Sequence, residues 1–223
     1  MEGRPVSAAV EDYLKAIYRL EQQGKVTTKA LALALDVAAP SVTAMIKRLH
    51  AMRLVRYTRY RGVALTAAGK RMALEVIRHH RLLELYLVET LGLPWDQVHE
   101  EAERLEHVIS EELEERIAEH LGHPMTDPHG DPIPTKEGQV EQPDYLPLSE
   151  LSPGAAAVVK RVVDQDPAKL RYLGTLGLFP EARVILLEKA PFDGPMSLKV
   201  GENRCALGGE LAREIYVLPV ERP

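Results

Sequence analysis

The stretch TTKALALALDVAAPSVTAMIKRLHAMRL (residues 27–54) predicts two short helices joined by a tight turn. Thr27 suits the N-cap of a helix that ends near Leu35, because its hydroxyl can accept from a free backbone N–H. Pro40 suits the first turn of a second helix that ends near Met52, where its missing N–H costs nothing. The apolar side chains of this second helix recur at spacings of three and four: Val42, Met45, Ile46 and Leu49.

The next residues, LVRYTRYRGVALT (54–66), hold two β-rich arms around Arg61-Gly62, which is a hairpin signal. Upstream, residues 7–22 have helical spacing, with Ser7 as a candidate cap. A helix, a helix pair with a short turn and then a basic hairpin form the order of a winged helix-turn-helix.

The remaining residues predict two more parts. Long helical patterns run from about 67 to 91 and from about 97 to 121. Residues 124–153 hold seven of the sixteen prolines and predict an irregular linker. From residue 153, apolar runs such as Ala182–Leu187 and Ile215–Val220 alternate with Gly/Pro turns, which indicates a small antiparallel β domain. The predicted fold class is therefore mainly α with a small β domain.

The composition bounds the class of protein. Of 223 residues, 45% are hydrophobic and 27% are charged, which is typical of a globular protein. The sequence contains no run of about 18 apolar residues and no secretory signal at its start, so we expect no membrane span. A single cysteine, Cys205, excludes an internal disulfide and favours a reducing, cytoplasmic compartment.

Charge is unevenly distributed along the chain. Residues 1–75 carry 13 Lys/Arg against 6 Asp/Glu, a net +7, whereas residues 76–123 carry 4 against 12, a net −8. A basic helix-turn-helix region favours double-stranded DNA as a partner, although an ordinary basic surface on a small helical domain is the alternative. The candidate DNA contacts are Pro40, Ser41, Thr43, Lys47 and Arg48 on the second helix, and Arg56, Arg59, Tyr60 and Arg61 in the hairpin.

The acidic region carries possible metal ligands. On a helix over 97–121, one arc beside the apolar stripe contains His99, Glu103, Glu106 and His107. His80 and Glu84 form another i, i+4 pair on the preceding helix. A salt-bridged, solvated helix surface is the alternative. Because the set offers oxygen and imidazole but no thiolate, Mn(II) and Fe(II) fit it better than structural zinc or copper(I).

Enzyme signatures are missing from the sequence. His99-Glu100 begins a zinc-protease-like pattern, but Glu103 stands where the second histidine is required. The sequence has no Gly-rich phosphate loop and no nucleophile elbow. We therefore expect the metal to be an effector and the protein not to be an enzyme. The alternative is a metal-storage protein or metallohydrolase whose basic domain is incidental.

Several segments together resemble the diphtheria toxin repressor family of metal-dependent transcriptional regulators, which includes the manganese transport regulators. The resemblance covers nearly the whole chain. It implies a winged helix-turn-helix at 1–74, a helical dimerisation and metal-binding domain at 75–140, a linker at 141–152 and an SH3-like barrel at 153–223. The segments that carry it are VEDYLKAIYRL (10–20), APSVTAMIKRL (39–49), YRGVALTAAGK (60–70), HHRLLELYL (79–87) and VHEEAERLEHVIS (98–110).

The resemblance also implies site residues. The family's main regulatory site maps onto Asp12, Glu103, Glu106 and His107, and the carboxylates at 12 and 103 are similar to those of the manganese-type members. The resemblance therefore implies Mn(II) as the metal, with Fe(II) as the alternative. Members with two adjacent metals have a glutamate where this chain has Lys15. The ancillary site maps onto His80, Glu84 and His99, completed either by Asp164 and Asp166 or by Asp127 and His129.

The implied function is that of a metal-loaded homodimer. It binds palindromic operators and represses genes for metal uptake. A metal that joins Asp12 to ligands in the dimerisation domain would favour the arrangement that matches two successive major grooves, about 34 Å apart.

Overall fold

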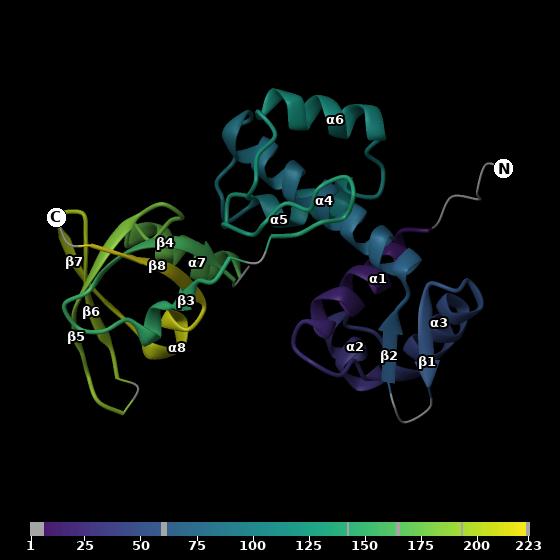
Figure 1. The fold of residues 1–223 in the computed structure, drawn as a ribbon, viewed down its shortest axis with the longest axis horizontal. Helices are drawn as coiled ribbons and strands as arrows, with labels where there is room; N and C mark the ends of the chain where they lie inside the picture. The colour runs from purple at the N-terminus through teal and green to yellow at the C-terminus, as the bar shows by residue number, and fades with distance from the viewer. Residues whose placement is uncertain (1–6, 59–61, 142, 164–165, 193, 222–223) are drawn as a thin grey trace. The chain divides into compact units, whose positions relative to one another are not determined.

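The structure is a computed structural model that describes residues 7–58, 62–141, 143–163, 166–192 and 194–221. The chain forms two compact units (Figure 1). The first unit contains Met1–His80, Leu105–Ser110 and Pro134–Val140. The second contains Arg81–Arg104, Glu111–Ile133 and Glu141–Pro223.

The first unit begins with three helices and a two-stranded hairpin. Thr27 caps the second helix as predicted, since its Oγ1 accepts a hydrogen bond from Ala30 N at 3.1 Å. Ser7 occupies the N-cap position of the first helix, but its side chain makes no capping hydrogen bond. The elements are α1 (Ala8–Glu21), α2 (Thr28–Ala34), α3 (Ala39–Ala51), β1 (Val55–Thr58) and β2 (Gly62–Leu65).

The core of this part is apolar and draws on every element. On α3, the predicted inner residues Val42, Ile46 and Leu49 are buried, and Met45 is partly buried. Burial of such side chains stabilises each of them by roughly 1.5–3 kcal/mol relative to exposure. The second helix of the pair is therefore held by its apolar stripe, with its polar side left outside.

The hairpin follows the predicted position. β1 and β2 pair antiparallel, from Val55 opposite Leu65 to Thr58 opposite Gly62. Gly62 has φ +102°, and a Cβ there would lie 2.6 Å from the carbonyl oxygen of Val26, so only glycine fits. The predicted tip residues Arg59, Tyr60 and Arg61 lie outside the described residues.

Of the three helices that follow the hairpin, the first agrees with the sequence prediction and the other two correct it. α4 (Ala67–Glu89) is one long helix followed by Gly92 at φ +70°, as expected. The single helix expected over 97–121 is wrong, because α5 (Val98–Leu105) and α6 (Glu111–His120) are separate. The reason lies in the local sequence. Two β-branched residues, Val108 and Ile109, are poor helix formers. Ser110 and the two glutamates that follow it are typical of a helix start, because the positive end of the α6 dipole stabilises acidic side chains.

The β domain is a six-stranded sheet in the second unit. Its strand order is β3-β8-β4-β5-β6-β7, and every neighbouring pair is antiparallel. A separate apolar core includes Leu170, Leu173, Leu186, Leu198 and Val217. The elements are β3 (Leu146–Pro147), the short 3-10 helix η1 (Leu148–Glu150), β4 (Ala156–Val162), α7 (Pro167–Thr175), β5 (Arg183–Lys189), β6 (Met196–Val200), β7 (Asn203–Leu207), α8 (Gly209–Ala212) and β8 (Ile215–Val220).

The proline-rich segment after α6 is irregular, as predicted, but it is not a free connector. Asp127, His129, Asp131 and Ile133 are all buried in the second unit. Val162 N donates to the carbonyl oxygen of His129 at 2.8 Å, which ties the segment to β4. The segment therefore contributes buried polar side chains at fixed positions.

No single described helix is both long and apolar enough to cross a membrane, and the bent pair α2 and α3 meets that test by length and composition only.

Candidate metal centres and DNA-binding surface

Three side chains form a candidate metal centre in the first unit: Asp12, Glu106 and His107. Asp12 lies on α1, and the other two lie in the turn that follows α5. Asp12 Oδ1 is 2.8 Å from His107 Nε2, and Glu106 Oε1 is 3.3 Å from the same nitrogen. One ligand atom from each residue lies within 4.8 Å of the others. Two carboxylates and an imidazole form a donor set that suits Mn(II) or Fe(II).

Glu11 orients the histidine of this centre, and the sequence analysis missed it. His107 Nδ1 is 2.6 Å from Glu11 Oε2. When Nδ1 carries the proton, the ring donates to Glu11, and the lone pair of Nε2 faces Asp12 and Glu106. These groups repel one another unless a cation lies among them or both ring nitrogens are protonated. The donor set therefore fits a metal ion.

Glu106 is held from two sides. It is 1% exposed, and its two oxygens are engaged by different side chains. Lys15 Nζ lies 2.5 Å from Oε1, and His80 Nδ1 lies 2.5 Å from Oε2. His80 was expected in the ancillary site with Glu84, whereas its Nδ1 here contacts Glu106.

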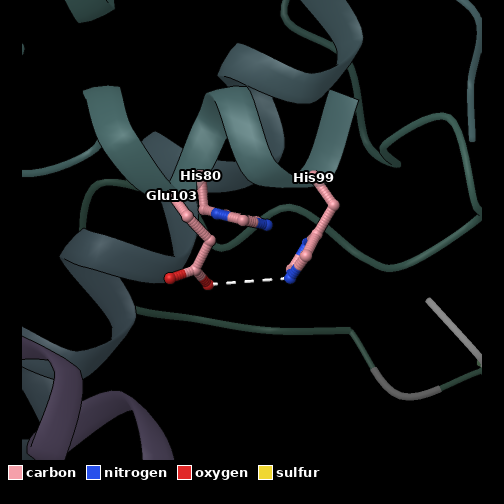
Figure 2. A group of neighbouring side chains, drawn as sticks. All are labelled: His80, His99 and Glu103. Atoms are coloured by element: carbon pink, nitrogen blue, oxygen red, sulfur yellow. Dashed lines mark ion pairs between the residues drawn. The ribbon is translucent and has the colours of Figure 1, made fainter. Parts of the chain in front are cut away.

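Glu103, the fourth predicted ligand of the main site, lies on α5 in the second unit. Its Oε1 is 3.8 Å from Nε2 of His99 one turn earlier (Figure 2, which also draws His80). The predicted arc placed these residues with Glu106 and His107 on one helix. Because α5 ends at Leu105, the arc covers only His99 and Glu103.

A second candidate centre is formed by Glu84, Asp127 and His129, all buried in the second unit. One ligand atom of each lies within 4.8 Å of the others. His129 Nε2 is 2.9 Å from the carbonyl oxygen of Trp95, so that nitrogen donates, and in the neutral ring Nδ1 keeps its lone pair. Asp127 Oδ1 accepts from the backbone N–H groups of His129 and Asp131, at 2.8 and 2.9 Å.

Two atoms of this second centre are available to a cation. Among the described residues, Asp127 Oδ2 and His129 Nδ1 are buried without a hydrogen-bond partner. Buried polar atoms are normally satisfied, so such a pair indicates a ligand. Glu84 lies beside them, with Oε2 3.9 Å from His129 Nδ1 and Oε1 3.1 Å from His99 Nδ1.

The electrostatics of the second centre also favour a cation. Burial raises the pKa of Asp127 well above its ordinary value, and the negative charges of Asp131 and Glu84 raise it further. Arg81 opposes this shift, with Nε 3.7 Å from Asp127 Oδ2. A divalent ion among these carboxylates would favour their charged forms.

The other proposed completion of the ancillary site involves Asp164 and Asp166. Asp164 lies outside the described residues. The carboxylate of Asp166 caps α7, where it accepts from Ala168 N at 2.8 Å and Lys169 N at 3.4 Å. That geometry explains Asp166 as a helix cap.

The polar side of α3 offers a candidate DNA-binding surface. Pro40, Ser41, Lys47 and Arg48 are exposed. Thr43 is partly buried, and its hydroxyl donates to the carbonyl oxygen of Ala39 at 3.0 Å. Arg56 on β1 is exposed as well.

Comparison with known proteins assigns the family. Residues 6–63 match the iron dependent repressor N-terminal DNA binding domain, and residues 66–135 match the iron dependent repressor metal binding and dimerisation domain. The iron-dependent repressor IdeR of Mycobacterium tuberculosis (strain ATCC 25618 / H37Rv) is 35% identical over 220 residues, which cover 93% of this chain and 95% of that protein. The chain belongs to the iron-dependent repressor family. The diphtheria toxin repressor of Corynebacterium glutamicum (strain ATCC 13032) is 33% identical over 222 residues, covering 95% of this chain and 96% of that protein.

Solved structures agree with this family. A manganese-dependent transcriptional repressor in complex with manganese is 39% identical with a TM-score of 0.86, covering 95% of this chain and 100% of that chain. The structure of ScaR with bound Zn2+ is 34% identical with a TM-score of 0.79, and the match covers 95% of this chain and 99% of that chain. Residues 146–219 match the FeoA domain, so the predicted winged helix, helical dimerisation domain and SH3-like domain are confirmed.

As a member of the iron-dependent repressor family, the protein is a metal-dependent, DNA-binding transcriptional repressor. Mn(II) and Fe(II) are both metals of the family. The alternative of a metal-storage protein or metallohydrolase with an incidental basic domain is not supported.

Proposed function

We propose that a metal bound by Asp12, Glu106 and His107 controls operator binding, with Glu103 as the expected fourth ligand. The observation that carries this proposal is the 2.8 Å approach of Asp12 Oδ1 to His107 Nε2. Asp12 lies within the match to the DNA-binding domain, whereas Glu106 and His107 lie within the match to the metal-binding and dimerisation domain. The centre therefore joins two functional parts of the chain.

The residues of this centre have distinct tasks. Asp12 supplies the ligand from α1, the first helix of the DNA-binding part. Glu11 holds the imidazole of His107 so that Nε2 faces the ligand position. When bound, the metal supplies positive charge that holds the two carboxylates and the imidazole together. The position of α1 relative to the turn at 106–107 is thereby fixed.

For the ancillary site, we propose Glu84, Asp127 and His129 as ligands. The orphaned Asp127 Oδ2 and His129 Nδ1 support this choice. His99, whose Nδ1 is 3.1 Å from Glu84 Oε1, is a further ligand or a group that orients Glu84. His80 and Asp166 engage other partners, so we assign them supporting roles.

Metal preference follows from the donor atoms. Both centres combine carboxylate oxygen with imidazole nitrogen, and neither includes the chain's single cysteine, Cys205 on β7. Such sets suit Mn(II) better than thiolate-preferring ions, with Fe(II) as the second choice. We propose a regulatory and not a catalytic role for the metal.

For DNA, we propose a homodimer in the cytoplasm that binds a palindromic operator. Ser41, Thr43 and Pro40 face base edges from α3, while Lys47 and Arg48 contact phosphates. In the hairpin, Arg59, Tyr60 and Arg61 contact the backbone or the minor groove. A two-fold dimer places two such surfaces on half-sites one helical turn apart.

The test begins with duplexes selected from a random pool by the protein in Mn(II). Fluorescence anisotropy then measures binding of a selected duplex in Mn(II) and in chelator. We expect binding that depends on Mn(II), and equal affinity in both conditions would refute the proposal.

Asp12→Ala should abolish this dependence while the dimer persists in analytical ultracentrifugation. Glu100→Ala, which removes an exposed carboxylate from α5, is the matched control and should behave as wild type. Full Mn(II)-dependent binding by Asp12→Ala would show that Asp12 is not the controlling ligand.

A further inference from the structure

A side chain of α1 holds the outer edge of the hairpin formed by β1 and β2. The N–H groups of Val63 and Leu65 on β2 point to the same side of the strand, because the two residues lie two positions apart. Val63 N donates to the carbonyl oxygen of Val26 at 3.1 Å. Leu65 N donates to Oε1 of Glu21 at 2.9 Å, across 44 residues of sequence. Both bonds therefore leave β2 on the side away from β1.

Glu21 is the last residue of α1, and this helix is well packed. Leu14 and Ile17 on α1 are fully buried and share one apolar core with Val63 and Leu65. The side chain of Glu21 is itself half-buried. Its carboxylate is therefore presented to the strand from a helix whose position does not depend on the hairpin alone.

The hairpin needs such support. A two-stranded hairpin is only marginally stable by itself in water, so its orientation depends on the groups that hold its edges. A hydrogen bond to a carboxylate is stronger than one between neutral groups. Leu65 is 7% exposed, so loss of the acceptor would leave its N–H poorly satisfied. Glu21 thus fixes the orientation of β2 and, through the strand pairing, that of β1.

We infer that Glu21 is a positioning residue for DNA recognition. Because its carboxylate fixes β2 relative to α1, the hairpin loses less conformational freedom on meeting operator DNA than an unanchored hairpin would. This inference rests on the proposed contacts between the hairpin and DNA. It adds a residue outside the hairpin that prepares the hairpin for those contacts.

Electrostatics makes the expected result distinctive. DNA is a polyanion, so removal of a carboxylate from the DNA-binding part should by itself strengthen binding. The lost hydrogen bond should act in the opposite direction and outweigh this effect. In Mn(II), we expect Glu21→Ala to bind the selected duplex roughly two- to tenfold more weakly than wild type, the range of a single hydrogen bond.

Glu21→Gln is the matched control, because it removes the same charge and keeps a carbonyl oxygen as acceptor. It should bind the duplex as tightly as wild type or more tightly. A Glu21→Gln protein as weak as Glu21→Ala would overturn the inference. Circular dichroism melting establishes that each variant is folded. If Glu21→Ala does not fold, Glu21→Met takes its place, since it keeps the length of the side chain without the carboxylate.

Two measurements separate this role from an effect on the metal centre. Hydrogen exchange at the Leu65 amide, followed by NMR, should be faster in Glu21→Ala than in wild type and Glu21→Gln. Mn(II) binding in equilibrium dialysis should be the same in all three proteins, because Glu21 lies roughly 13 Å along α1 from Asp12. Unchanged exchange at Leu65, or loss of Mn(II) binding in Glu21→Ala, would overturn the inference.

A mutant cycle with the hairpin arginines decides whether Glu21 acts through the hairpin. The Arg59→Ala/Arg61→Ala protein lacks the proposed contacts, so the addition of Glu21→Ala should cause no further loss of affinity. Losses that multiply would overturn the inference, because Glu21 would then act elsewhere in the DNA-binding part.

The same cycle tests the proposed hairpin contacts separately. Wild-type affinity in Arg59→Ala/Arg61→Ala would refute those contacts and, with them, this inference. Weak binding by that protein together with wild-type affinity in folded Glu21→Ala would refute only the role of Glu21.

Discussion

Gly130→Ala should damage both stability and the proposed second metal centre, because Gly130 directly follows the proposed ligand His129 and packs against the backbone of β4. Gly130 has φ +84°, and a Cβ there would lie 1.9 Å from the carbonyl oxygen of Lys160. The left-handed backbone costs an alanine roughly 1–2 kcal/mol. Relieving the clash with backbone costs about 1–3 kcal/mol more. The free energy of unfolding should therefore fall by about 2–5 kcal/mol in total.

Gly122→Ala is the matched control. Gly122 has φ +72°, but a Cβ there meets no atom within 4 Å among the described residues. This variant should lose only the roughly 1–2 kcal/mol of backbone strain. The difference between the two variants therefore isolates the contact between the 127–131 segment and β4.

The assay combines thermal unfolding with fluorescence of Trp95. For a chain of this size, each kcal/mol lowers Tm by roughly 2–4 °C. Trp95 is the single tryptophan of the chain, and its ring stacks on His129 with centroids 5.5 Å apart. Its emission should respond to Mn(II) in wild type and in Gly122→Ala, and respond less in Gly130→Ala. If Gly130→Ala melts no lower than Gly122→Ala and keeps the Mn(II) response, the argued close packing is refuted.

Three further predictions concern the ligands and the hairpin. Because burial and neighbouring carboxylates raise the pKa of Asp127, the stability of the metal-free protein should fall as pH rises from the ordinary aspartate range through that raised pKa. Asp127→Asn should remove this fall in chelator melts and weaken Mn(II) binding, and a melt unchanged from wild type at every pH would contradict the assignment. Asp12→Met should shift preference from Mn(II) toward Fe(II) or Ni(II) in competition dialysis, since a thioether is a softer ligand; an unchanged preference would argue against Asp12 as a ligand. Arg61→Ala and Arg59→Ala should each weaken operator binding and flatten its salt dependence, whereas an unchanged salt slope in both would exclude phosphate contacts.

Local sequence patterns determined the elements of the DNA-binding part. The spacing of Val42, Ile46 and Leu49 predicted the buried stripe of α3. Thr27 predicted a cap that the structure contains, and the arms around Arg61-Gly62 predicted a hairpin whose strands β1 and β2 pair as expected. Such signals are readable because each depends on residues a few positions apart. The break between α5 and α6 was also encoded locally, in the residues around Ser110, but helical periodicity on both sides obscured it.

Tertiary structure alone decided what surrounds the proposed metal ligands. Residue types and helical spacing predicted Glu106 and His107 as candidate metal ligands, and the family resemblance added Asp12. The contacts of Lys15 with Glu106 and of Glu11 with His107 span 91 and 96 residues, and no spacing rule connects such positions. The proline-rich composition around Asp127 and His129 predicted an irregular segment and gave no sign of burial. Charge balance and burial are properties of side chains that converge from distant segments, so the partners of each proposed ligand follow from the folded arrangement.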